Sequence, residues 1–195
     1  MDPINIIVAI NLFVSMSANM AAAKKGMKSK LSNVVERPKT YLQKFPPNVS
    51  AVILILAIAA VFNLGTFQEE IKAEYFTYRI IGLIFFIVFS WVQVGSFKSL
   101  GEFYAQDILV FKNHNLITNG FYKYIRHPQY LSQILSDLGV GIALMGYLII
   151  PLVIVIELPL FILRAVFEDK LLEKHFKEKF VNYKKKSGFI IPFIG

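Results

Sequence analysis

The residues best suited to chemistry stand in a polar cassette, residues 116–130, between two strongly apolar stretches. Its ionisable and hydroxyl-bearing members include Tyr122, Arg126, His127 and Tyr130. A second charged cluster follows the next apolar stretch and contains Arg164, Glu168 and Asp169. Such groups can orient an anionic acceptor or take up a proton during a reaction. An apolar chain has little other reason to keep them at a water boundary, so we expect the functional site there.

The residue types of the cassette also allow a purely structural explanation. Pro128 is suited to the first turn of a helix, where its missing N–H is not needed. Arg126 can extend its charged end towards lipid headgroups. The tyrosines fit the aromatic belt that membrane interfaces attract. Residue types alone leave this explanation and the chemical one open.

The composition indicates that lipid is the main solvent of the chain. Hydrophobic residues make up 55% of the 195 residues, the mean hydropathy is +0.54, and there are 18 phenylalanines. Long apolar runs cover residues 4–23, 49–67, 80–97 and 131–167. The last run is nearly twice the roughly 20 residues that cross a bilayer, so we expect it to form a helical hairpin. The sequence thus predicts an all-α integral membrane protein with about five transmembrane helices.

The expected organisation is an N-terminal part, residues 1–100, with three spans and a basic linker at 24–48. A C-terminal catalytic region, residues 101–195, would follow. It would contain a cofactor motif at 114–130, the hairpin at 131–167, and a cytoplasmic helix and tail at 168–195. Helical spacing places Leu172, Phe176, Phe180 and Tyr183 on one face of that last helix, which suits a lid or a surface helix.

Charge placement predicts the topology. The net charge of +8 is concentrated in the linker, around the cassette and at the C-terminus, whereas the loop after the second span carries Glu69, Glu70 and Glu74. The positive-inside rule then places the N-terminus outside and both the cassette and the C-terminus in the cytoplasm. The basic flanks report contact with membrane lipids and not with nucleic acid. The chain has no cysteine, which excludes thiolate catalysis and disulfides.

The hairpin predicts which polar residues meet across its two arms. In an antiparallel hairpin, residues equidistant from the turn lie at similar depth. A turn centred on Tyr147 would pair Asp137 with Glu157, Tyr130 with Arg164, and Arg126 with Glu168. Buried carboxyls are costly unless paired or functional. Asp137 and Glu157 could share a proton or approach a cation, or each could bind backbone or a neighbouring span separately.

The two motifs together resemble the isoprenylcysteine carboxyl methyltransferase family, which has the phospholipid N-methyltransferases as relatives. The matching positions lie in the C-terminal half of the chain and are His114 to Ile117, Gly120, Tyr122, Arg126 to Tyr130, Arg164, Glu168, Asp169, Leu172, Phe180, Tyr183 and Pro192. The combination is fairly specific. The string Arg-His-Pro-x-Tyr alone is not, because some membrane sterol reductases carry a similar one.

This resemblance implies that S-adenosylmethionine binds on the cytoplasmic side and that a lipid substrate approaches from the bilayer. The positions it assigns to the cofactor are His114, Asn115, Leu116, Ile117, Gly120, Tyr122, Arg126, His127, Pro128, Gln129, Tyr130 and Glu168. It assigns substrate contact to Arg164, and it makes Arg164 and Glu168 the expected catalytic residues. The family usually has two glutamates where this chain has Glu168 and Asp169, which leaves the role of Asp169 open.

The expected activity is methyl transfer to a lipidic acceptor, most simply the carboxylate of an isoprenylcysteine-like molecule. Such a transfer is an in-line displacement that needs alignment of the reactants and no metal. A carboxylate is already anionic at pH 7, whereas an amine must first lose a proton, for which Glu168 would be the base. The alternatives are a phospholipid amine N-methyltransferase, a sterol-type reductase using a nicotinamide dinucleotide, and a non-catalytic membrane scaffold.

Overall fold

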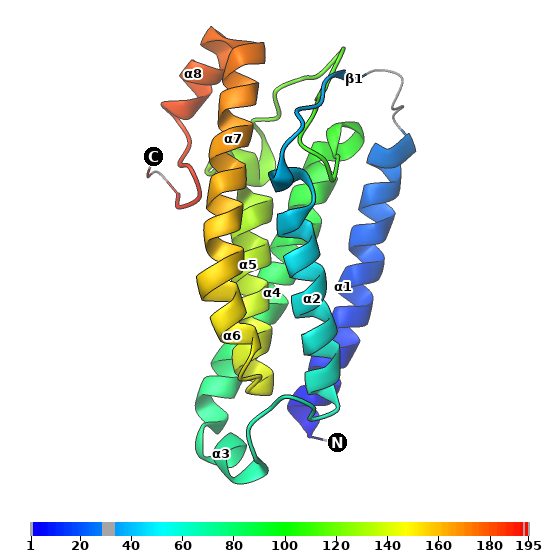
Figure 1. Cartoon of the computed structure of the whole chain (residues 1–195), viewed down its shortest axis with the longest axis vertical. Coiled ribbons are helices and arrows are strands. Elements are labelled where there is room, and N and C mark those ends of the chain that lie inside the picture. The colour runs from blue at the N-terminus through cyan, green and yellow to red at the C-terminus, as the bar shows by residue number, and fades with distance from the viewer. Residues whose placement is uncertain (1, 29–33, 193, 195) are drawn as a thin grey trace.

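The computed structural model describes residues 2–28, 34–192 and 194, so residues 29–33 of the predicted linker lie outside the described part. The structure is an elongated helical bundle (Figure 1). Its long helices are α1 (Pro3–Lys28), α2 (Phe45–Val61), α4 (Phe76–Leu100), α5 (Pro128–Leu144) and α7 (Leu158–Phe176). Shorter helical elements are η2 (Tyr41–Gln43), α3 (Glu69–Glu74), η3 (Gly101–Phe103), η4 (Gly120–Lys123), α6 (Ile149–Leu152), η5 (Val153–Glu157) and α8 (Glu178–Lys184).

Four helical segments of the described chain are long and apolar enough to cross a membrane. They are Pro3–Ala22, Tyr41–Val61, Phe76–Phe103 and Ile149–Phe176. The chain is therefore an all-α, multi-pass integral membrane protein. Helix α5 was expected to supply a fifth span, but its 17 residues fall short of the length of these four.

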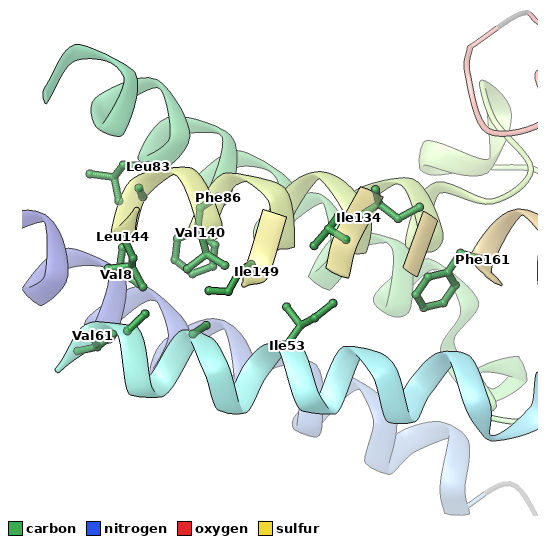
Figure 2. Close-up of a cluster of buried hydrophobic side chains, with 14 of the residues drawn as sticks. Val8, Ile53, Val61, Leu83, Phe86, Ile134, Val140, Leu144, Ile149 and Phe161 are labelled. Carbon is green, nitrogen blue, oxygen red and sulfur yellow. The ribbon is translucent and has the colours of Figure 1, made fainter. Parts of the chain in front are cut away.

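The core of the bundle lies where α1, α2, α4, α5 and α7 face one another. Figure 2 shows part of it, with Val8, Ile53 and Phe86 directed towards α5 and α6. Large apolar side chains elsewhere point outwards, and Phe13 and Val155 are 75% and 70% exposed. A helix that is apolar on all sides suits lipid on its outer face.

Helices α4 and α5 approach each other closely because glycines face the contact. A Cβ atom added to Gly139 would lie 2.5 Å from the backbone nitrogen of Phe86, and one added to Gly82 would lie 2.7 Å from the nitrogen of Ala143. Small residues at such contacts are common between membrane helices because they let backbones pack closely. This contact holds α5, and with it the start of the hairpin, against the centre of the bundle.

The hairpin turn lies where the sequence predicts it. Helix α5 ends at Leu144, Met145 adopts a left-handed conformation with φ of 54°, and α6 begins at Ile149. The returning arm contains one π-helical turn, Val153–Glu157, in which the N–H of Leu158 bonds to the carbonyl of Val153. Pro159 follows and has no N–H for the usual helical bond. Glu157, the last residue of this wider turn, is fully buried.

The end of the bundle that holds the cassette differs from expectation in two ways. A small antiparallel sheet joins β1 (Val34–Glu36), from the predicted linker, to β2 (Val110–Phe111). Helix α7 also runs on to Phe176, so the second arm of the hairpin does not end at 167 as predicted. Lys177, with φ of 50°, separates it from α8. The N-terminus lies at the opposite end of the bundle, near α3 (Figure 1).

Candidate active site

The hairpin joins the cassette to the second charged cluster. The Tyr130 hydroxyl donates a hydrogen bond to Glu168 Oε2 at 2.8 Å and accepts one from Arg164 Nε at 2.9 Å. Tyr130 and Arg164 are both buried. The predicted pairing of Tyr130 with Arg164 is therefore confirmed, and two motifs separated by more than 30 residues form one site.

His127 bridges the two carboxylates of α7. Its Nε2 lies 2.9 Å from Asp169 Oδ1, and its Nδ1 lies 3.5 Å from Glu168 Oε2. Burial lowers the pKa of His127, but the hydrogen bonds to Asp169 and Glu168 outweigh it and raise the pKa above the usual value. The imidazole is thus held towards its charged form, and the Tyr130 ring stacks on it with centroids 5.5 Å apart.

Arg126 pairs with Asp169 and not, as the hairpin register predicts, with Glu168. Arg126 Nε lies 3.0 Å from Asp169 Oδ2. The guanidinium also donates to the carbonyl of Ser187 at 2.7 Å. Asp169 therefore joins α7 to the cassette, and Arg126 joins the cassette to the C-terminal tail, while Glu168 faces Tyr130.

The C-terminal segment closes over the cassette. Backbone hydrogen bonds of 2.9 Å join Arg126 N–H to Gly188 and Gly188 N–H to the carbonyl of Tyr124. The Tyr183 hydroxyl donates to the carbonyl of Tyr122 at 2.6 Å. Ile190 belongs to the buried core. Helix α8 and the tail therefore cover the cassette, one of the two placements that the amphipathic pattern allows.

A first cavity, which we call the loop cavity, lies between the cassette, α7 and α8. The predicted residues that line it are His114, Asn115, Leu116, Ile117, Tyr122, Arg126, His127, Gln129 and Glu168. Three other predicted residues do not line it. Gly120 has φ of 57° at the start of η4, Pro128 begins α5, and Tyr130 lines a second cavity.

Two buried polar atoms of this loop cavity have no partner among the described residues, namely His114 Nδ1 and the Tyr122 hydroxyl. His114 stacks on Phe103 with centroids 5.1 Å apart. Burial, followed by the nearby His175, lowers the pKa of His114 to about 4, so its ring is neutral at pH 7. Burial and the charge of Glu168 raise the pKa of Tyr122, so its hydroxyl remains a donor. Unpaired buried groups of this kind fit a polar ligand with an aromatic part.

A second cavity, the inner cavity, adjoins the first, because Ala105 and Gln129 line both. Its other lining residues are Pro47, Ser50, Gln93, Phe97, Tyr104, Gln106, Tyr130, Gln133, Phe161 and Arg164. Arg164 donates to the carbonyls of Leu42 at 2.8 Å and Gln43 at 3.2 Å, and also to that of Gln106. With the bond to Tyr130, four of the five guanidinium N–H groups have partners in the described chain.

Asp137 and Glu157 are neighbours across the hairpin, as its register predicts, because each contributes to the other's electrostatic environment. Ser50 donates to Glu157 Oε1 at 2.6 Å, and Gln133 donates to Asp137 Oδ2 at 2.7 Å. Glu157 Oε2 has no donor in the described chain. Each carboxyl is thus held by a residue that lines the inner cavity.

Several site residues have no place in the sequence prediction. The carbonyls of Leu42 and Gln43, which hold Arg164, come from the segment predicted to be a linker. Phe103 and Phe176 contact the ring of His114. Gln93 and Ser50 could have been noticed as polar residues within apolar runs, but backbone carbonyls carry no signal in the sequence.

Comparison with known families places most of this site inside one family model. The model of the phospholipid methyltransferases matches residues 77–179, slightly more than half of the chain. The match begins in α4 and ends at the start of α8, so it includes the cassette, the hairpin and both carboxylates of α7.

Curated relatives and a solved structure point in the same direction. The protein-S-isoprenylcysteine O-methyltransferase of Tribolium castaneum is 32% identical over 42% of this chain and 29% of its own length. That of Saccharomyces cerevisiae is 26% identical over 59% of this chain and 49% of its own length. The chain thus spans half or less of these relatives. A eukaryotic intramembrane Ras methyltransferase, an isoprenylcysteine carboxyl methyltransferase, has a similar fold, with a TM-score of 0.66 and 21% identity over all of this chain and 69% of that one.

Proposed function

The chain belongs to the phospholipid methyltransferase family, and from that premise we propose that it is an S-adenosylmethionine-dependent membrane methyltransferase. Its acceptor would be the carboxylate of a lipidic, isoprenylcysteine-like molecule. The observation that carries the proposal is the adjoining pair of cavities, one with unpaired buried polar groups and the other with a buried arginine. The curated relatives that match the chain carry the same reaction in their names.

The loop cavity is the proposed cofactor site. The neutral His114 ring, packed against Phe103, would meet the adenine, and the Tyr122 hydroxyl would donate to a polar group of the cofactor. Glu168 would face the positive charge of the sulfonium. When bound, the cofactor supplies an activated methyl group, and the residues of the chain need only align the acceptor with it.

The surroundings of Glu168 favour a carboxylate acceptor over an amine. Glu168 already accepts a hydrogen bond from Tyr130 and faces the imidazole of His127. Glu168 Oε2 therefore already has two partners, and taking up a further proton would weaken its contact with the His127 ring. An amine acceptor would have to lose a proton to such a group, whereas a carboxylate reacts as the anion present at pH 7. The phospholipid amine N-methyltransferase reaction stays the second candidate, since the family model bears that substrate class in its name.

Arg164 is the proposed partner of the acceptor carboxylate. It is buried, lines the inner cavity, and has one N–H without a partner in the described chain. Its other N–H groups hold three carbonyls and Tyr130, so its position is fixed before an acceptor binds. We therefore expect one direct hydrogen bond, together with the positive charge, to orient the acceptor.

For the membrane we propose five crossings, with the N-terminus outside and the cassette and C-terminus in the cytoplasm. The N- and C-terminal ends lie at opposite ends of the bundle (Figure 1). An even number of crossings would return them to the same side, so α5 is the added span. Residues 1–100 would then anchor the chain and residues 101–195 would carry the reaction, with the lipid acceptor arriving from the bilayer.

The acceptor class can be tested with membranes that contain the overexpressed protein and a methyl-labelled donor. We expect label in a lipid fraction that base releases as methanol, because esters hydrolyse and methylamines do not. The control is the same membrane preparation with Arg164→Leu, which should lose the base-labile label. Base-stable label in a lipid amine would instead support the second candidate.

A further inference from the structure

The side chain of Gln43 joins two segments that lie far apart in the chain. Gln43 is buried and stands at the end of η2, just before α2. Its amide nitrogen donates to the carbonyls of Pro38 at 3.0 Å and Ile108 at 2.8 Å, and its amide oxygen accepts from the Ile108 N–H at 2.7 Å. An opposite residue in an antiparallel sheet exchanges the same two bonds. The amide therefore takes the place of a strand as the partner of Ile108.

The two joined segments also hold Arg164. Arg164 Nη1 donates to the carbonyls of Leu42 at 2.8 Å and Gln43 at 3.2 Å, and Nη2 donates to the carbonyl of Gln106. The Gln43 amide binds the second segment at Ile108, two residues beyond Gln106. Helix α7, η2 and the segment before β2 are therefore connected in a closed ring of contacts around the guanidinium.

Other contacts between the two segments fix these carbonyls less well. Leu42 and Ile108 pack in one buried apolar cluster, but apolar packing is not directional. Arg37 and Asp107 form an ion pair, but their side chains are 50% and 27% exposed, and exposed pairs contribute little. The β1–β2 sheet joins the same segments further along each of them. The hydrogen bonds of Gln43 are buried and directional, so they best determine how the peptide groups face the guanidinium.

We propose that Gln43 is a positioning residue for methyl transfer, which orients Arg164 by holding the carbonyls of η2 and of Gln106 in place. This inference rests on the proposed function. Gln43 lies outside residues 77–179, so the match to the family model does not include it. The segment that leads into α2 therefore takes part in the reaction and does not only connect helices.

The first test measures whether Gln43 holds the guanidinium, without using methyl transfer. The chain has four arginines, so nitrogen-15 labelling of arginine gives few Nε–H signals in detergent micelles. The signal of Arg164 is the one missing in Arg164→Lys. Its rate of hydrogen exchange with water reports how often the guanidinium leaves its partners. Gln43→Met keeps the length of the side chain without its hydrogen bonds, and we expect exchange about five- to tenfold faster than in the wild type.

Two further variants control this measurement. Asn11→Leu is the matched control, because the Asn11 amide also donates to Ser90 and accepts from Trp91 but lines none of the described cavities. Its Arg164 signal should exchange as in the wild type. Gln43→Asn keeps an amide but withdraws it by one bond, so it too should quicken the exchange, even if Gln43→Met does not fold. Exchange within about twofold of the wild type in the folded Gln43 variants would overturn the positioning role.

The second test asks whether Gln43 affects methyl transfer through Arg164. With N-acetyl-S-farnesylcysteine as acceptor, we expect Gln43→Met to lower kcat/KM about ten- to hundredfold, because small displacements of an orienting group have effects of that size. If Gln43 acts through Arg164, adding Gln43→Met to Arg164→Lys should lower kcat/KM by less than about twofold further, whereas independent losses multiply. Multiplied losses would overturn the positioning role.

The two tests also separate this inference from the proposed function. Methyl transfer by the wild type, with unchanged exchange in the Gln43 variants, would overturn the inference alone. Quickened exchange in Gln43→Met, with neither methyl transfer nor S-adenosylhomocysteine binding in the wild type, would contradict the proposed function and leave standing only the effect of Gln43 on Arg164.

Discussion

Two carboxyl pairs lie on the same hairpin and differ in what faces them. Glu168 and Asp169 meet two positively charged partners, because Asp169 pairs with Arg126 and both carboxylates contact His127. Asp137 and Glu157 meet each other and two neutral donors, Ser50 and Gln133. A buried negative charge is stable only when it is paired or neutralised. The first pair thus meets cationic partners at the proposed cofactor site, whereas the described side chains that donate to the second pair are neutral.

The same Glu→Gln change at both pairs should give the largest contrast in methyl transfer. Glu168→Gln removes a charge that faces the buried His127 and the proposed sulfonium, and loss of one partner of such a contact costs about 3–4 kcal/mol, or about 10²- to 10³-fold. Glu157→Gln should stay within about threefold of the wild type. Initial rates at saturating donor provide the measurement. Comparable losses of methyl-transfer rate in both variants would contradict the distinction between the two pairs.

Aspartate-to-asparagine changes should separate the pairs by stability. Asp169→Asn leaves Arg126 and His127 facing an uncharged group, and we expect a loss of about 2–3 kcal/mol in the free energy of unfolding. Asp137→Asn removes no charged partner and adds an N–H near Glu157 Oε2, which has no donor in the described chain, so its cost should be below about 1 kcal/mol. Unfolding of both variants in mixed micelles measures the two values. A larger cost at Asp137 than at Asp169 would contradict this distinction between the pairs.

The two site histidines should produce opposite pH dependences. The raised pKa of His127 means that its contribution to stability is complete below about pH 6.5 and is lost as the pH rises through its folded-state pKa. The pKa of His114 near 4 means that its contribution is present above about pH 6.5 and is lost as the pH falls towards 4. The measurement is the thermal midpoint in detergent as a function of pH. We expect the fall of the midpoint at alkaline pH to be absent in His127→Gln, and its fall at acid pH to be absent in His114→Gln. If both variants keep the wild-type dependence of the thermal midpoint on pH, neither ring contributes to it.

The smallest effect is expected at an ion pair of α7 that faces solvent. Glu173 lies 3.1 Å from Lys184 Nζ, with side chains 45% and 38% exposed. Exposed pairs contribute little because water already stabilises both charges. Glu173→Gln should therefore change the free energy of unfolding by less than about 0.5 kcal/mol and leave the rate of methyl transfer unchanged. It serves as the surface counterpart of Glu168→Gln.

The sequence predicted how deep each residue of the hairpin lies. It predicted only in part which way each side chain points around its helix. Equal distance from the turn correctly placed Tyr130 opposite Arg164 and Asp137 opposite Glu157. The same reasoning chose Glu168 for Arg126, whereas Asp169 is the partner. Neighbouring residues differ in depth by only about 1.5 Å but point about 100° apart, so the turn alone cannot select between them.

Other parts of the site depend on groups that the sequence does not single out. The segment before α2 reads as a linker, yet the carbonyls of Leu42 and Gln43 fix Arg164. Every residue has a carbonyl, so only the fold reveals which ones are used. The aromatic surroundings of His114 come from η3, β2 and α7, three places far apart in sequence. The cassette, in contrast, could be recognised in the sequence because its residues lie close together along the chain.

Titration of the purified protein with S-adenosylhomocysteine and with a nicotinamide dinucleotide tests the central claim most directly. Calorimetry would use the wild type, Tyr122→Ala and Glu168→Ala, with Asn11→Leu as the folded control. We predict that the wild type and Asn11→Leu bind S-adenosylhomocysteine, that both site variants lose this binding, and that none of the four binds the dinucleotide. Binding of the dinucleotide alone, or S-adenosylhomocysteine binding that survives both site variants, would contradict the assignment of the loop cavity as a methyl-donor site.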